Sequence, residues 1–206
     1  MISRKKSLIF ICFIYAALIL LLLPSCSNAV RLKNDGDTGN LIDEENGLYY
    51  IYCLGYLRAA EIKANVYARG NRGEKLHELP GIDPAQWLSE NIGTMGVPFL
   101  FREQSVEEPT LEDFETEKIY VTMSEEITIQ IRSITEKDII ETIINDFLYG
   151  EAIPFPAFTA DSLTLNFSSE KYKGIYYILE YLTDDEGNYY IFDRWTNRCV
   201  LSSIIF

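Results

Sequence analysis

The chain has 206 residues, and its formal net charge of −13 comes from 31 acidic residues against 18 basic ones. The first 25 residues hold three of the basic residues and none of the acidic ones, so the remaining 15 basic and 31 acidic residues give −16. This excess of acidic residues excludes a nucleic-acid binder and disfavours electrostatic adsorption to anionic lipid, while an apolar fraction of 48% excludes a largely disordered chain.

The first 26 residues have the order of a secretory signal peptide. A basic end, Arg4-Lys5-Lys6, precedes 16 uncharged residues, Leu8–Leu23. The segment that closes this run, Leu23-Pro24-Ser25-Cys26, resembles the lipobox of bacterial lipoproteins. The resemblance implies that residues 1–25 are a cleaved signal peptide and that Cys26 carries a diacylglyceryl group. It also implies that the chain is anchored in the cell membrane, with its domain on the extracytoplasmic side.

Two other interpretations of the leader stay open, an uncleaved membrane anchor and simple secretion. As a helix, 16 residues at about 1.5 Å each reach about 24 Å, which is less than a hydrocarbon core of about 30 Å. The length therefore favours a cleaved signal over an anchor. In the lipoprotein and anchor interpretations alike, the basic end stays inside and the domain lies outside the cytoplasm.

After the leader, the composition divides the chain once more. Residues 26–46 are polar and rich in Gly, Asp and Asn, which predicts that the lipidated Cys26 is followed by a flexible tether. Residues 47–206 are then predicted to form a single α+β domain. A finer division into sub-units 47–134 and 135–206 follows the change from scattered strands to a helix with strands behind it.

The first half of this domain is predicted to hold short strands and one helix. Residues 61–69 alternate polar and apolar side chains, which is the period of a half-buried strand. Asp83 before Pro84 offers an N-cap and a first helical position, which predicts about two helical turns over Pro84–Asn91. The other strands are predicted at Leu48–Leu54, Val97–Arg102, Lys118–Met123 and Ile127–Ile134.

The second half is predicted to be a helix followed by a four-stranded meander. Isoleucines at helical spacing form an apolar stripe over Glu136–Tyr149, with Thr135 and Asp138 as a capping box and Gly150 at the C′ position. Four strands with hairpin-length turns follow at 162–168, 175–182, 189–193 and 199–205. The predicted fold class is therefore α+β with a mainly antiparallel sheet. The mature domain resembles only uncharacterised lipoproteins of Gram-positive anaerobes, which implies no function.

The sequence offers no recognisable catalytic set. The only histidine, His77, lies in a polar stretch that predicts a surface loop, and no serine has a G-x-S-x-G elbow. One histidine and two unlipidated cysteines do not make a common zinc site. The acidic pairs are predicted to be solvated loop charges, although paired carboxylates can hydrolyse glycosides: Glu107-Glu108, Glu112-Asp113, Glu125-Glu126 and Asp184-Asp185-Glu186. No catalytic residue, metal ligand or cofactor is therefore predicted.

Two features of the mature chain leave alternatives open. Tyrosines are abundant in the first and last strands, which predicts either an exposed aromatic binding face or faces covered within the domain. Cys53 and Cys199 lie in predicted strands near the two ends of the domain. They are predicted either to form a disulfide, which is favoured outside the cytoplasm, or to be buried free thiols.

The tether, the aromatic strands and the absence of a catalytic set favour a lipid-anchored binding or interaction module of the bacterial envelope. Its expected partners are the membrane, through the lipid on Cys26, and an envelope protein or glycan, with no role for nucleic acid. Two alternatives remain, a structural or assembly factor of the envelope and a carboxylate-dependent extracytoplasmic hydrolase.

Overall fold

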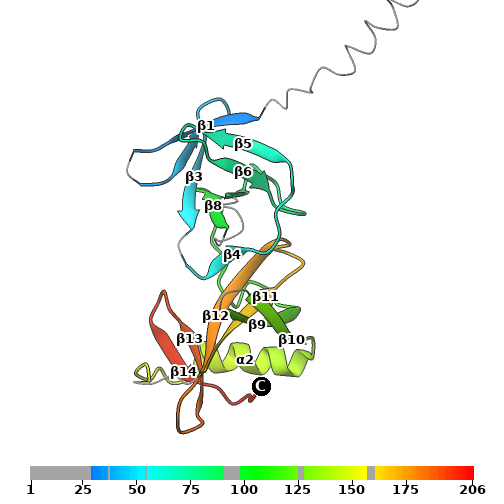
Figure 1. Ribbon diagram of the computed structural model, residues 1–206, viewed down its shortest axis with the longest axis vertical. Helices are drawn as coiled ribbons and strands as arrows, with labels where there is room; N and C mark the ends of the chain where they lie inside the picture. Colours follow the sequence, from blue (N-terminus) through cyan, green and yellow to red (C-terminus); the bar gives the residue numbers. More distant parts are fainter. Residues whose placement is uncertain (1–28, 37, 54, 91–97, 125–127, 157–160) are drawn as a thin grey trace, which may run out of the picture.

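The computed structural model describes residues 29–206 except 37, 54, 91–97, 125–127 and 157–160. Its strands form two bodies, a small closed barrel and an open sheet, with one described helix against the sheet (Figure 1). The barrel strands are β1 (Val30–Asn34), β2 (Leu41–Asp43), β3 (Leu48–Cys53), β5 (Val66–Gly70), β6 (Lys75–Glu78), β7 (Trp87–Glu90) and β8 (Phe99–Glu103). The sheet strands are β4 (Leu57–Ala59), β9 (Lys118–Ser124), β10 (Thr128–Ile134), β11 (Asp161–Ser168), β12 (Ile175–Thr183), β13 (Tyr189–Asp193) and β14 (Arg198–Leu201).

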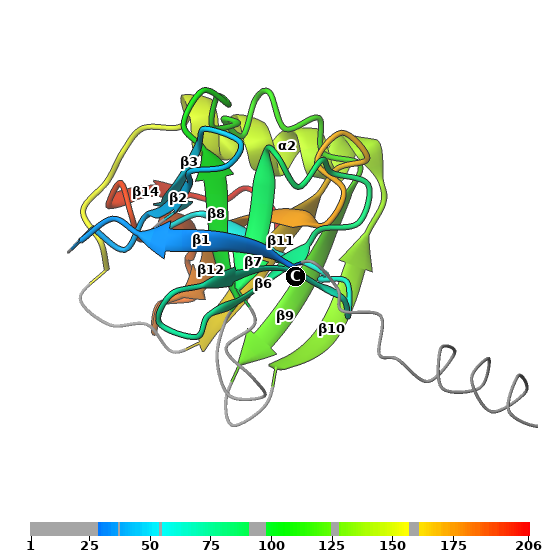
Figure 2. The ribbon, with the colours of Figure 1, turned by 90° about the horizontal axis from the view of Figure 1, so that it is seen from above.

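The barrel closes because its first strand pairs on both sides. The strand order is β1-β2-β3-β8-β7-β6-β5, and β1 returns to β5 in parallel while the other neighbours are antiparallel. Figure 2, which views the molecule from the barrel end, shows β1 crossing the near side. Alternate residues of the strands point inward and fill the barrel, so that its interior is a packed core: Leu32, Leu41, Tyr50, Ala68, Leu76, Leu88 and Phe101.

The sheet confirms the predicted α+β class and the C-terminal unit. The helix α2 (Lys137–Tyr149) is followed by β11, β12, β13 and β14, which are antiparallel neighbours in chain order. Ile140, Ile143 and Phe147 bury the apolar stripe of α2 in the main core, which also holds Val121 and Leu179 from the sheet. The strand order β10-β9-β11-β12-β13-β14 leaves β10 and β14 at the edges.

The ends of α2 differ from the prediction. Glu136 is the N-cap residue and makes no side-chain cap, so the capping box of Thr135 and Asp138 does not form. Gly150 has φ −63° and extended backbone instead of the left-handed conformation of a C′ glycine. The C-terminal carbonyls are satisfied from β14, because the Arg198 guanidinium donates to the carbonyls of Phe147 (2.9 Å) and Gly150 (2.8 Å).

A short crossing strand joins the two bodies. Between β3 and β5 the chain leaves the barrel, and β4 pairs antiparallel with β12, where Leu57 lies opposite Tyr177. The main core is continuous through this junction, since it includes Leu57, Leu100 and Trp87 together with the residues that face α2. The finer division at residue 134 is wrong, because β9 and β10 belong to the same sheet as the C-terminal half.

The predicted tether at 26–46 is wrong where the structure describes it. Leu32 and Leu41 are 2% and 1% exposed because β1 and β2 are barrel strands. The Gly/Asp/Asn-rich residues form the turn between these strands, in which the Asp35 amide donates to the Asn40 carbonyl at 2.9 Å. The domain therefore begins at Val30 instead of residue 47, and only three residues separate Cys26 from β1.

The predicted helix over Pro84–Asn91 is also wrong. Asp83 does cap a turn, with its carboxylate accepting from the Ala85 amide at 2.9 Å, but the turn ends at Trp87. The next residues form β7, in which Trp87, Leu88 and Ser89 are all buried. Consecutive residues of a strand point to opposite faces, so their burial requires that both faces of β7 are covered. Leu88 packs inside the barrel, and Trp87 packs in the main core.

Candidate binding site

Of the two alternatives for Cys53 and Cys199, the structure has the buried free thiols and not the disulfide. Cys53 ends β3 and packs into the main core, whereas Cys199 on β14 packs with Leu182, Tyr190 and Phe192 in a separate cluster. Burial raises the pKa of the Cys53 thiol to about 12 and also raises that of Cys199, so both thiols stay protonated at neutral pH. Cys26 lies outside the described residues.

His77 is buried in β6, so its assignment to a surface loop is wrong. Its Nδ1 lies 2.9 Å from the Lys63 carbonyl oxygen, which requires this nitrogen to donate. The polar neighbours Lys75 and Glu78 led to the loop prediction, but they flank two buried residues of the strand, Leu76 and His77. The histidine therefore has a satisfied structural hydrogen bond within the barrel.

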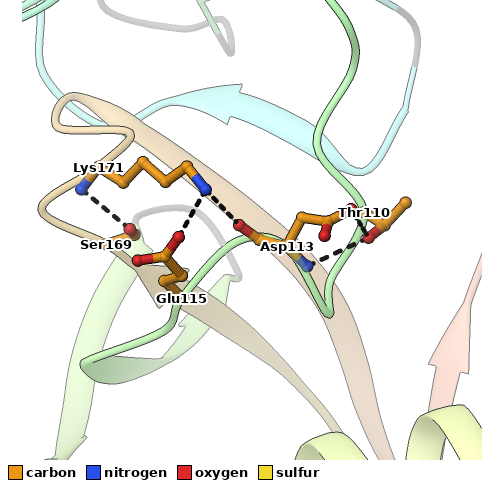
Figure 3. A network of polar contacts seen from close by, with 5 residues as sticks. All are labelled: Thr110, Asp113, Glu115, Ser169 and Lys171. Carbon is orange, nitrogen blue, oxygen red and sulfur yellow. Dashed lines mark hydrogen bonds and ion pairs between the residues drawn. The ribbon is translucent and has the colours of Figure 1, made fainter.

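The acidic pairs that the structure describes are at the surface. Asp184 organises the β12–β13 turn, where hydrogen bonds from the Tyr190 hydroxyl and the Asn188 side chain lower its pKa to about 2. Glu112 and Asp113 are exposed in the connection before β9. Figure 3 shows that Lys171 binds Glu115 (2.5 Å) and the Asp113 carbonyl (3.4 Å), which fastens this connection to the β11–β12 loop. The pair Glu125-Glu126 lies outside the described residues.

Most aromatic side chains of the last strands are covered within the domain. Tyr177 and Tyr181 face the core, while Tyr176 on the other face of β12 lies 5.7 Å from Tyr120 between ring centroids. The strands therefore do not present a continuous exposed aromatic face. Two exposed aromatic side chains, Trp195 and Phe99, line one cavity where the barrel meets the sheet, whereas the exposed Tyr149 and Phe155 do not line it.

Trp195 is held out from the β13–β14 turn by local hydrogen bonds. The Asp193 carboxylate accepts from the Trp195 amide (2.9 Å) and from the Thr196 hydroxyl (2.8 Å). The indole lies against Gly55, where an added Cβ would be 3.1 Å from the indole Cγ. Gly55 also has φ +125°, a conformation that side chains strain, so only glycine fits here. The indole is nevertheless 56% exposed.

Phe99 forms the facing wall from the barrel. It begins β8, is 39% exposed, and meets the Tyr52 ring edge to face at a centroid distance of 5.1 Å. Between Trp195 and Phe99 lies an open cavity of about 170 Å³. The residues that line it include Tyr52, Gly55, Leu57, Arg58, Phe99 and Trp195. We call this cavity the junction groove.

Arg58 is the cationic residue in the lining of the junction groove. Its guanidinium is half-buried, and desolvation lowers its pKa although Glu180 partly offsets this effect. The Glu180 carboxylate is itself bound by Arg194 at 2.7 Å. Within the described part of the chain, Arg58 makes no ion pair. A partly desolvated cation beside aromatic walls can pair with a carboxylate brought by a ligand.

Sequence reasoning located the turn that carries Trp195 and the strand that begins with Phe99, but it did not bring them together. Their meeting depends on β4, a three-residue strand too short to produce a detectable pattern. The one local indication of the site was a tryptophan in a predicted turn, Trp195-Thr196-Asn197. Turns lie at the surface, so a large apolar side chain there is expected to be exposed.

Comparison of the chain with protein-family models, curated proteins and solved structures found no match. Among the described residues, no helix is both long and apolar enough to cross a membrane.

Proposed function

We propose that the protein is a lipid-anchored binding module on the extracytoplasmic side of a bacterial membrane, with the junction groove as its binding site. The observation that carries this proposal is that two exposed aromatic residues, Trp195 and Phe99, line one groove with the half-buried Arg58, which has no ion-pair partner among the described residues. The Leu23-Pro24-Ser25-Cys26 segment supports the anchor.

The chemistry of the groove favours an envelope glycan that carries carboxylates, such as peptidoglycan. Aromatic rings offer large, rigid apolar faces on which the apolar face of a sugar ring can pack. Arg58 is suited to a carboxylate, because charge-assisted hydrogen bonds from a guanidinium can be bidentate. An envelope protein with an acidic and aromatic segment is the competing occupant of the same groove.

Co-sedimentation with purified peptidoglycan tests the ligand assignment. We expect Trp195→Ala and Arg58→Gln each to weaken binding at least about tenfold, as buried anchors of binding sites do. Tyr149→Ala is the matched control, since Tyr149 on α2 is also exposed and lies away from the groove. Wild-type binding by both groove variants, with unchanged thermal stability, would refute the assignment.

Fatty-acid labelling tests the anchor separately. We expect Cys26→Ala to abolish incorporation of radioactive fatty acid and to release part of the chain from membranes. Equal labelling of the wild type and the variant would remove the anchor from the proposal while leaving the groove to be judged by sedimentation.

The edge strand β10 favours a second candidate, an assembly factor of the envelope. Among the described strands, β9 alone pairs with β10. Six of the seven residues of β10 are exposed, and Ile129 and Ile131 are each about half exposed. Such an edge can accept a strand of another chain. If this is the function, Ile131→Lys should abolish capture of an envelope protein while Trp195→Ala leaves it unchanged.

A further inference from the structure

Three cationic side chains form a row on the outside of the barrel, although the chain as a whole is strongly acidic. Arg31 on β1 lies opposite Arg69 on β5, and Arg69 lies opposite Lys75 on β6. Their chain neighbours Leu32, Ala68 and Leu76 point into the barrel core, so the three cations share the outer face. Because three neighbouring strands carry one cation each, the row spans about 10 Å. We call it the cationic row.

The cationic row is not neutralised by the described part of the protein. All three side chains are exposed, and none of them makes an ion pair or a side-chain hydrogen bond there. Two of the nearby carboxylates are engaged elsewhere, since Glu44 binds Lys33 (2.5 Å) and Glu74 accepts from the Asn34 side chain (2.9 Å). Glu45 lines the same surface hollow as Arg31 and Arg69 but makes no ion pair with them. Like charges directly opposite each other destabilise a sheet, so this row favours an anionic partner.

The position of the row identifies that partner as the membrane. Arg31 is five residues from Cys26, so even an extended chain separates them by at most about 18 Å. The strands β1, β5 and β6 lie at the end of the molecule away from α2 (Figure 1). We propose that, when the lipid on Cys26 is inserted, the cationic row docks on the phosphates of anionic lipid headgroups. This inference rests on the proposed lipid anchor.

The net charge of −16 after the leader limits the cationic row to orienting a protein that is already anchored. A free chain of that charge is repelled from an anionic surface, so the row cannot recruit the protein. Once the anchor holds β1 near the bilayer, only charges within about 10 Å of the surface act strongly. The row then orients the domain with the barrel against the headgroups. Each cation near the surface favours this orientation by about fivefold.

Lysine footprinting on vesicles tests the orientation without using cellular lipidation. The chain from Cys26 onward contains all the described structure, and Cys53 and Cys199 are buried, so Cys26 can be coupled selectively to a maleimide lipid. Acetylation of each lysine is then measured by mass spectrometry. We expect Lys75 to react at least about fivefold more slowly on phosphatidylglycerol vesicles than on phosphatidylcholine vesicles. Lys137, on α2, should react equally on both.

Charge variants and salt complete the test. Arg31→Gln/Arg69→Gln should remove the protection of Lys75, whereas Arg31→Lys/Arg69→Lys and the distant Lys137→Gln/Lys173→Gln should keep it. Salt at about 1 M, where the Debye length is about 3 Å, should also remove it. Equal reactivity of Lys75 on the two vesicles overturns the proposal. Soluble glycerol phosphate is the second comparison. If it protects Lys75 as well as phosphatidylglycerol vesicles do, the proposal is also overturned, because the row would then bind anions that are not part of a membrane. Neither result depends on whether cells lipidate Cys26.

Discussion

At the scale of single residues, the guanidinium of Arg198 replaces the C-terminal cap that α2 lacks. It binds carbonyl oxygens of the last turn and lies 5.8 Å from the centroid of the Phe147 ring. A cation at this end also interacts favourably with the helix dipole. The sequence contains no basic residue in the last turn of α2, so the cap had to come from another element and could not be predicted locally.

Removing this cap should destabilise the protein measurably. We expect Arg198→Ala to lower the free energy of unfolding by about 1.5–3 kcal/mol, since buried carbonyls lose charged donors. Arg194→Ala, which removes the exposed partner of Glu180, should cost less than about 1 kcal/mol. Urea denaturation of both variants measures the difference, and equal losses would contradict the capping role.

Asp184 links stability to acid pH. Its pKa falls from the usual 3.8 to about 2 because Tyr190 and Asn188 donate to its charged form. A lowered pKa means that this stabilisation is complete above about pH 4 and is lost as the pH falls through about 2. We therefore expect the wild type to lose more stability between pH 4 and pH 2 than Asp184→Asn. Parallel acid-unfolding curves of the two proteins would argue against this role for the carboxylate.

At the scale of elements, α2 depends on the burial of its apolar stripe. Ile143 is 1% exposed in the main core. Replacing it with Ala removes apolar surface and leaves a cavity, so we expect Ile143→Ala to lower the free energy of unfolding by about 2–5 kcal/mol. Ile129→Ala on the edge strand β10, where the side chain is about half exposed, is the matched control. Chemical denaturation should show less than about 1 kcal/mol for that variant.

The second half of the chain could be predicted because its elements are long and their patterns are local. The stripe over Glu136–Tyr149 and the alternation in 175–182 each carry several repeats, and both elements appear within about one residue of the prediction. The three-residue strands β2 and β4 hold too few side chains to show a period. The segment Trp87–Glu90 is covered on both faces, so its uninterrupted burial did not distinguish a strand from a short helix.

The candidate site was harder to predict than the elements, because it depends on contacts between distant parts of the chain. The aromatic excess and the β13–β14 turn were visible in the sequence, whereas the approach of Trp195 to Gly55 joins residues 140 positions apart. Burial of the other tyrosines likewise depends on which face each strand turns to the core. Composition therefore left open whether the aromatic side chains form an exposed face or are covered within the domain, and it did not bring Trp195 and Phe99 together.

At the scale of the whole molecule, the main core takes side chains from both the barrel strands and the sheet. The strand β4 leaves the barrel to pair with β12, and Leu57 from this strand packs with Tyr177 and Leu100 in the main cluster. The chain then returns to complete the barrel with β5 through β8. The sheet therefore takes β4 from within the stretch of chain that forms the barrel, so the two bodies are structurally coupled.

We therefore expect the barrel and the sheet to unfold together. Hydrogen exchange in increasing denaturant should give the same opening free energy for amides of β6 in the barrel and of β11 in the sheet, because a shared core makes local opening as costly as global unfolding. Leu57→Ala should lower both values by the same amount, about 2–5 kcal/mol. Leu32→Ala, which removes a side chain from the separate barrel cluster, should also lower both if the bodies are coupled. A loss confined to barrel amides in Leu32→Ala would show instead that the barrel unfolds on its own, and that β4 only connects two independent units.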